Sequence, residues 1–147
     1  MNKKQKSLTN KGFSLVELII VIAIMAVLVG VLAPQYLKYV HNSKVSTDIT
    51  NAQEMATAIN VAVADQKVTA VTSDTTATGD ALTTLMNSTA AKVPVSKLGG
   101  TWSVKYNTTD GVKEVTLTVD SKVYSCYPNP DQAAAAGVNA GLNTLKK

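Results

Sequence analysis

The sequence contains only one cysteine and one histidine, and this scarcity excludes several kinds of site. Cys126 has no second cysteine in the chain, so an intramolecular disulfide is excluded. A cluster of cysteine and histidine ligands around zinc cannot be built from Cys126 and His41 within one chain. We expect Cys126 to be a small buried side chain on a strand and His41 to be solvated or interfacial. No metal site is predicted.

Motifs for catalysis or cofactor binding are also lacking. No glycine-rich phosphate loop follows a predicted strand, and no nucleophile can be combined with a base and an orienting acid. Asp74, Asp80 and Asp110 lie in turn-like stretches, where turns and caps are a better explanation than a calcium site. We therefore predict no catalytic residues, no cofactor and no enzymatic activity.

Beyond the N-terminus the sequence lacks an excess of positive charge. The chain has 14 basic and 10 acidic residues, and four of the basic ones are Lys3, Lys4, Lys6 and Lys11. Beyond residue 12 the two signs balance, so the charge pattern does not indicate a nucleic-acid partner. A basic N-terminus before an apolar stretch instead follows the positive-inside rule, with residues 1–12 in the cytoplasm.

One long hydrophobic run follows this basic segment. Every residue from 18 to 33 is apolar or glycine, and with residues 13–17 the run reaches the roughly 20 residues that cross a hydrocarbon core as a helix. An ordinary secretion signal has a shorter apolar region, of about 7 to 15 residues. An ordinary anchor explains the length but not Glu17, since a charge near the centre of a membrane helix costs about 2.5 to 3.5 kcal/mol and needs a partner.

Residues 11–17 read KGFSLVE and continue as LIIVIAIMAVLVGVLAPQY, which resembles the class III signal and transmembrane helix of type IV pilins and pseudopilins. The resemblance implies that a prepilin peptidase cuts between Gly12 and Phe13 and methylates the new amine of Phe13. It also implies that Glu17 of one subunit neutralises this amine of a neighbour in a filament. The alternative is that Glu17 lies near the lipid headgroups and has no role in assembly.

Gly30 and Pro34 interrupt the otherwise uniform helical pattern. Proline removes a backbone donor and clashes with the preceding turn, and glycine lowers helix propensity by about 1 kcal/mol. The resemblance implies a helix hinge between these residues that melts when the filament assembles. A static kink is the alternative.

Beyond Pro34 the pattern becomes amphipathic, with apolar residues at alternating spacings of three and four. This stripe consists of Val45, Ile49, Ala52, Ala56, Ile59 and Val63, and the polar face between them includes Lys44, Asp48 and Glu54. We divide the chain into a cleaved leader (1–12), a transmembrane and filament-core helix (13–33), an amphipathic continuation (34–66) and a head (67–147).

The head is predicted to be an α+β layer structure in which the long helix packs on a small antiparallel sheet. Three strands are expected at 101–107, 112–119 and 122–127, and residues 68–80 are read as an exposed connection. Asp80 is expected to cap a short helix at 81–88. Little regular structure is expected from Pro128 onward, apart from a helical turn around 132–136. The missing second cysteine departs from the disulfide-bounded loop of Gram-negative pilins and favours a Gram-positive type.

Together these expectations predict that the chain is a structural subunit, the major pilin of a type IV pilus. It would polymerise through its N-terminal helix into an extracellular filament for adhesion or motility. The implied partners are further copies of the chain, the prepilin peptidase, and the assembly platform with its ATPase. The precursor would be a single-pass protein of the cell membrane, and the filament would lie at the cell surface. A pseudopilin of a type II secretion or competence DNA-uptake system is one alternative, and a membrane-anchored surface binding module is another.

Overall fold

The computed structural model describes residues 12–131 and 138–147, and the chain divides into two compact units, Met1–Leu37 and Lys38–Lys147. The predicted leader before Gly12 and the predicted helical turn at 132–136 lie outside the described residues.

Helix α1, Leu15–Ala64, begins in the first unit and ends in the second. Its first part is rich in leucine and isoleucine, and its large apolar side chains are exposed. Among the described residues α1 is the one helix that is long and apolar enough to cross a membrane. The predicted long N-terminal helix is confirmed.

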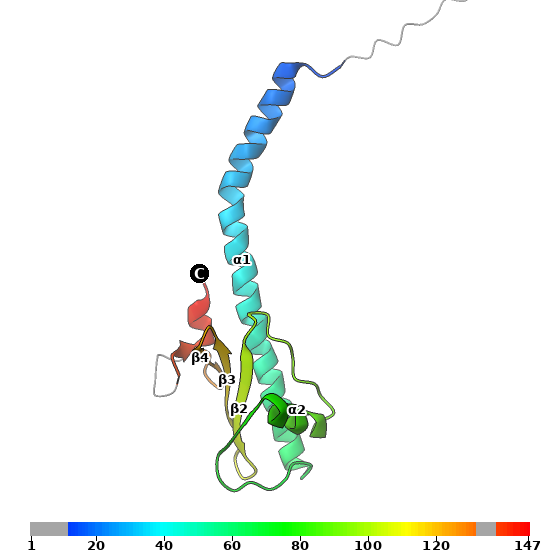
Figure 1. Ribbon diagram of the computed structural model, residues 1–147, viewed down its shortest axis with the longest axis vertical. Coiled ribbons are helices and arrows are strands. Elements are labelled where there is room, and N and C mark those ends of the chain that lie inside the picture. The colour runs from blue at the N-terminus through cyan, green and yellow to red at the C-terminus, as the bar shows by residue number, and fades with distance from the viewer. Residues whose placement is uncertain (1–11, 132–137) are drawn as a thin grey trace, which may run out of the picture. The chain divides into compact units, whose positions relative to one another are not determined.

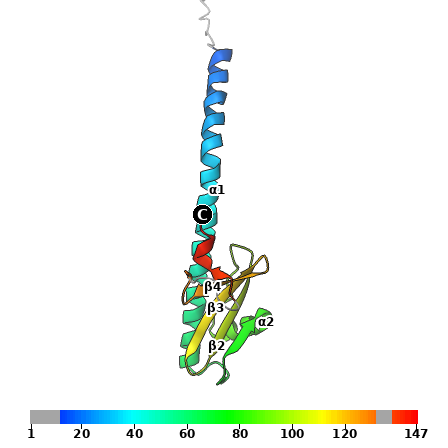
Figure 2. The same cartoon turned by 90° about the vertical axis from the view of Figure 1, so that its left-hand side faces the viewer.

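The second unit contains a sheet with the strand order β1-β2-β3-β4-β5. Its three central strands are β2 (Thr101–Asn107), β3 (Gly111–Val119) and β4 (Lys122–Tyr127), which pair antiparallel. They lie side by side in both views of the head (Figures 1 and 2). The three predicted strands are therefore confirmed, with β3 beginning at Gly111.

The two edge strands were not predicted. β1 (Thr75–Thr78) pairs antiparallel with β2, so the supposed exposed connection contains a strand, and β5 (Ala140–Gly141) pairs parallel with β4. The prediction of about three strands is thus too low. β1 has only Ala77 buried among threonines, and β5 has two residues, so neither carries an apolar alternation long enough to recognise.

Helix α2 (Gly79–Ser88) packs against β1 and β2. Leu82, Leu85 and Met86 are buried on one side of α2, as the sequence predicts. The prediction of Asp80 as its cap is wrong, because the helix begins at Gly79 and Asp80 lies in its first turn. Gly79 has a φ of +52°, which glycine adopts readily, and this lets the helix start directly after β1.

The core of the second unit lies between α1 and the inner face of the sheet. The predicted stripe on α1 is buried except for Val63, which is partly buried, and Met55 joins it. The sheet contributes buried side chains from β2, β3 and β4: Trp102, Val104, Tyr106, Val115, Leu117, Tyr124 and Cys126. The prediction of Cys126 as a buried strand residue is confirmed.

Asp48 contradicts the predicted polar face of α1, because it is fully buried. Its carboxylate accepts hydrogen bonds from Ser96 Oγ (2.8 Å), from the Lys97 amide (2.8 Å) and from the Leu98 amide (3.0 Å). A buried charge is tolerated when it is hydrogen-bonded in this way. Asp48 therefore holds the segment before β2 against α1.

The last residues of the chain are ordered against α1, contrary to the expectation of little regular structure. A 3-10 helix, η1 (Leu142–Leu145), fully buries Leu142. His41 is partly buried and donates a hydrogen bond from Nε2 to the Leu145 carbonyl (2.9 Å). Asn42 exchanges two hydrogen bonds with the backbone of Lys147, of 2.9 and 2.8 Å. These partners lie more than a hundred residues apart in the chain, which explains why local pattern did not predict them.

Candidate functional site

The predicted processing site lies in an exposed segment just before α1. Gly12 and Phe13 have no regular secondary structure, and Phe13 is 92% exposed. A methyl group added at Gly12 would meet no atom within 4 Å. The peptide bond between the two residues is therefore open to an approaching protein, as proteolytic sites generally are.

Glu17 lies in the first turn of α1 and forms a capping box with Ser14. The Ser14 amide donates to Glu17 Oε2 (2.9 Å), and the Val16 amide donates to Ser14 Oγ (3.3 Å). These bonds satisfy backbone donors that have no partner inside the helix, and a carboxylate is favourable at a helix N-terminus. The sequence analysis missed this role, although the Ser-x-x-Glu spacing signals it.

The capping bond uses one oxygen of an exposed carboxylate. A carboxylate accepts hydrogen bonds at both oxygens, so Glu17 keeps capacity for a second, cationic partner. Glu17 and Phe13 are brought to the same end of α1, but the capping bond goes to Ser14 rather than to Phe13.

The first unit presents an apolar surface around the whole helix. Its large side chains are about half exposed, from 46% for Val21 to 66% for Val27, within a stretch that carries no charge from 18 to 33. A surface of this kind requires either lipid or other apolar helices around it.

Gly30 and Pro34 both lie inside α1, which continues through them. They are four residues apart, so the nitrogen of Pro34 stands where a donor to the Gly30 carbonyl would be. Proline has no N–H, and the helix therefore lacks one hydrogen bond at the position where glycine also lowers its propensity. The structure thus places a weak turn here and shows it in the helical state.

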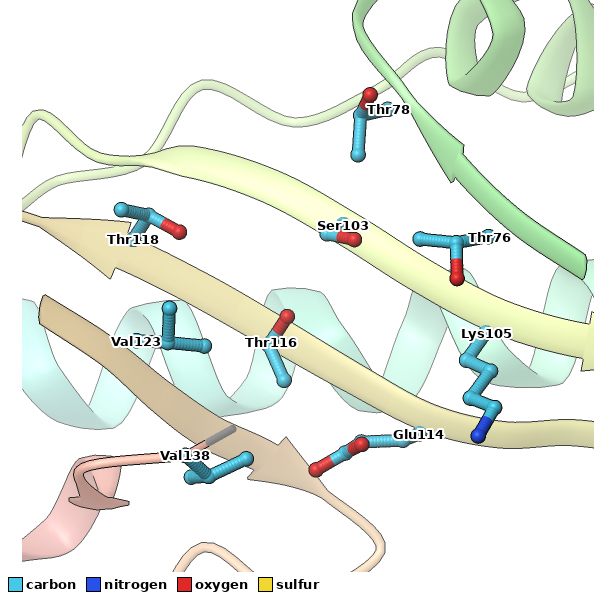
Figure 3. Close-up of a pocket in the computed structure, with 9 residues that line it drawn as sticks. All are labelled: Thr76, Thr78, Ser103, Lys105, Glu114, Thr116, Thr118, Val123 and Val138. Atoms are coloured by element: carbon cyan, nitrogen blue, oxygen red, sulfur yellow. The ribbon is translucent and has the colours of Figure 1, made fainter. Parts of the chain in front are cut away.

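The outer face of the sheet carries a second candidate surface, which the sequence analysis did not predict. A cavity of about 350 Å³ is lined there by Thr76, Thr78, Ser103, Lys105, Glu114, Thr116, Thr118, Val123 and Val138. Figure 3 shows these side chains on the face of the sheet opposite α1. The lining offers hydroxyl groups, one ammonium group and one carboxylate for hydrogen bonds.

The acidic residues in the turns form local structural pairs. Asp110 forms an ion pair with Lys113 (2.6 Å), and hydrogen bonds from Lys113 and then Asn107 lower the pKa of Asp110. Asp74 accepts a hydrogen bond from Asn107 and lies 3.5 Å from Lys105. Within residues 12–131 and 138–147, no three potential ligands gather where they could hold a metal ion.

The chain matches the family model described as the prokaryotic N-terminal methylation motif over residues 8–33. It is 45% identical over 57 residues to a type IV major fimbrial protein FimA of Dichelobacter nodosus, and two further FimA proteins from that organism are 42% and 44% identical over the same length. These alignments cover 39% of this chain and 36% of each relative, so the chain spans about a third of the length of the proteins it matches. No solved structure matches the chain.

The motif and the geometry agree at the N-terminus. The matched motif covers Gly12, Phe13, Glu17 and most of the exposed apolar helix. An α+β unit with the remainder of α1 on a mostly antiparallel sheet follows, as the resemblance implies. The N-terminal region of this chain therefore carries the prokaryotic N-terminal methylation motif, and the chain is similar to type IV major fimbrial proteins over part of its length.

Proposed function

We propose that this chain is the major subunit of a type IV pilus, which polymerises through the first part of α1 into a filament at the cell surface. One observation carries the proposal: the methylation motif at 8–33 coincides with a helix whose apolar side chains are exposed on all sides. The FimA relatives are major fimbrial proteins by name, which supports the major-subunit assignment. Adhesion or motility would be the role of such a filament.

The precursor would be held in the cell membrane by residues 13–33, with residues 1–12 as a leader on the cytoplasmic side. Prepilin peptidase would cleave between Gly12 and Phe13, where the chain is exposed. Cleavage replaces a neutral amide with an amine that is cationic near neutral pH and that the enzyme then methylates. The assembly platform and its ATPase would move the processed subunit into the filament.

The new amine supplies the partner that Glu17 lacks in a membrane. Two unit charges 4 Å apart attract each other by about 4 kcal/mol at an effective dielectric constant of 20. Lipid tails are as apolar as leucine, so hydrophobic contact alone does not favour one helix alignment over another. A contact between Glu17 and the Phe13 amine of a neighbour would fix the register of the packed helices, while the bond to Ser14 is kept.

Gly30 and Pro34 would form the hinge of the assembled subunit. The missing donor at Pro34 already removes one hydrogen bond from this turn, so unwinding it costs less than unwinding the helix elsewhere. The amphipathic part (34–66) would then carry the head (67–147) on the outside of the filament.

Mass spectrometry of the N-terminus of the cell-surface form tests the proposal. We expect a mature chain that begins at N-methylated Phe13 and is recovered from sheared filaments. A chain that begins at Met1, or one cleaved beyond Pro34, would contradict the proposal and leave α1 as an ordinary anchor or signal. Recovery of the processed chain only from the membrane, without filaments, would favour the pseudopilin alternative.

A further inference from the structure

A pocket of about 360 Å³ lies in the second unit and is separate from the processing and assembly residues. Three lysines from different parts of the chain line it: Lys44 on α1, Lys97 in the segment before β2, and Lys122 at the start of β4. We call this the lysine pocket. His41 and Asp120 also line it.

The lining of the lysine pocket contains three lysines and one acidic residue, Asp120, and all four are exposed. The ion pairs within 4 Å among the described residues involve Lys67, Lys105 and Lys113, and none involves a lysine of the pocket. The lysines outnumber the one acidic residue in this lining, so the formal charge around the pocket is positive. The lysine pocket is therefore a place where a bound anion would be stabilised.

Part of the lining of the lysine pocket is apolar. Leu98, Tyr124 and Leu145 contribute to it, and all three pack in or against the hydrophobic core. The hydrogen bond from His41 to the Leu145 carbonyl fixes one side of the lining. Cationic and apolar side chains in one pocket fit an anion that carries an organic group.

Lys44 lies close in the sequence to the apolar run. It follows Ala33, the last residue of that run, by eleven positions. Eleven residues span at most about 40 Å when fully extended, so Lys44 stays within that distance of the outer headgroups, where phosphate groups are abundant, when residues 13–33 cross a bilayer.

We propose that the lysine pocket binds a phosphate group, in the form of an anionic phospholipid headgroup or a soluble organic phosphate. A phosphate has several oxygens and can accept hydrogen bonds from more than one ammonium group at once. Binding at this pocket does not depend on filament formation.

The test uses the full-length chain, isotope-labelled for NMR, in a detergent without charge. Glycerol 1-phosphate and inorganic phosphate are titrated at constant ionic strength, and the amide shifts of Lys97 and Lys122 are followed. The same chain is then placed in nanodiscs of phosphatidylcholine with or without phosphatidylglycerol. A saturable shift with the soluble phosphates assigns a soluble ligand, and a shift confined to the phosphatidylglycerol discs assigns the lipid.

The triple variant Lys44→Gln, Lys97→Gln, Lys122→Gln should bind at least about tenfold more weakly, a loss of about 1.4 kcal/mol. The control is Lys67→Gln, Lys92→Gln, Lys113→Gln, which removes the same charge from exposed positions outside the pocket and should bind as the parent does. If the triple variant does not fold, Lys122→Gln alone serves, with a smaller loss in the same direction. No saturable shift with any phosphate, or an equal loss in the control, would overturn the proposal.

Discussion

Glu17 and Asp48 are two carboxylates of α1 that lie in opposite environments. Asp48 is buried, and both of its oxygens are occupied by three donors of its own chain. Glu17 is exposed and receives one bond, from the Ser14 amide. Burial keeps Asp48 from any partner outside its own chain, whereas the exposed carboxylate of Glu17 keeps acceptor capacity for one. The proposed role in assembly therefore requires Glu17 and not Asp48.

The substitution Glu17→Gln separates the two roles of this side chain. Glutamine is accepted at N3, the third helical residue, where a capping box has its glutamate. The bond to Ser14 is therefore kept in this variant, but the charge is lost. We expect α1 and the head to form normally while surface filaments, counted by electron microscopy of sheared material, fall by at least about tenfold, which corresponds to about 1.4 kcal/mol.

Glu54→Gln is the matched control, since Glu54 is an exposed acid of the same helix in the second unit. It should assemble normally. Normal filament counts in Glu17→Gln would show that Glu17 serves only as a cap, and the register role would then be wrong.

At the scale of elements, the helices and strands that are long and have regularly spaced apolar residues could be predicted from the sequence. α1 was recognisable from its apolar run and its stripe, and β2 to β4 from their alternation. Asp48 was wrongly assigned to an exposed polar face. The spacing of apolar residues shows which face of a helix a residue lies on but not which segment covers that face, and the segment around Ser96 covers Asp48. Among the site residues, the motif indicated Gly12, Phe13 and Glu17, whereas the lysine pocket joins Lys44, Lys97 and Lys122 from elements that only the tertiary fold brings together.

Asp48→Ala should destabilise the connection between α1 and β2. The substitution removes the acceptor of the Lys97 amide and of the Ser96 hydroxyl, while the Leu98 amide keeps Ser96 Oγ as a second acceptor at 3.2 Å. An unsatisfied buried donor costs about 1 to 3 kcal/mol. We expect the free energy of unfolding to fall by about 2 to 4 kcal/mol in urea titrations of the full chain in detergent.

Asp80→Ala is the control for the loss of unfolding free energy expected in Asp48→Ala. Asp80 is an exposed acid in the first turn of α2, where a favourable interaction with the helix dipole is worth only about 0.3 to 1 kcal/mol. Losses of similar size in the two variants would contradict a structural role for the buried carboxylate.

At the scale of the whole molecule, the two units are stabilised in different ways. The first unit is a helix with exposed apolar side chains, and it needs lipid or neighbouring helices to cover them. The second unit has its own core, in which Cys126 is completely buried. Cys126 therefore reports on the opening of this unit.

The Cys126 thiol should remain unreactive toward thiol reagents until the head unfolds. Burial raises the pKa of this thiol to about 12, and the negative charge of Asp48 adds to the rise. Because the thiolate is the reactive form, modification at pH 8 should be slow in buffer and should become fast across the urea unfolding transition. The folded head binds the thiol proton more tightly than the unfolded chain, so stability should be lost as pH rises from about 9 toward 12.

An exposed cysteine provides the reference rate for this measurement. Ser46→Cys in a Cys126→Ala background places a thiol on the exposed side of α1 and should react promptly without urea. Equally prompt reaction of Cys126 in the native protein would show that the head opens far more readily than its packing indicates.

The sheet ends in short strands on both sides, four residues in β1 and two residues in β5. Exposed strand edges are templates for β-augmentation and amyloid-like growth, and a short edge limits the backbone that an incoming strand could pair with. In the filament proposed above, many copies would lie close together, and exposed strand edges would then be a hazard. The short edges of this sheet limit such pairing, so the exposed apolar part of α1 is the surface that favours self-association.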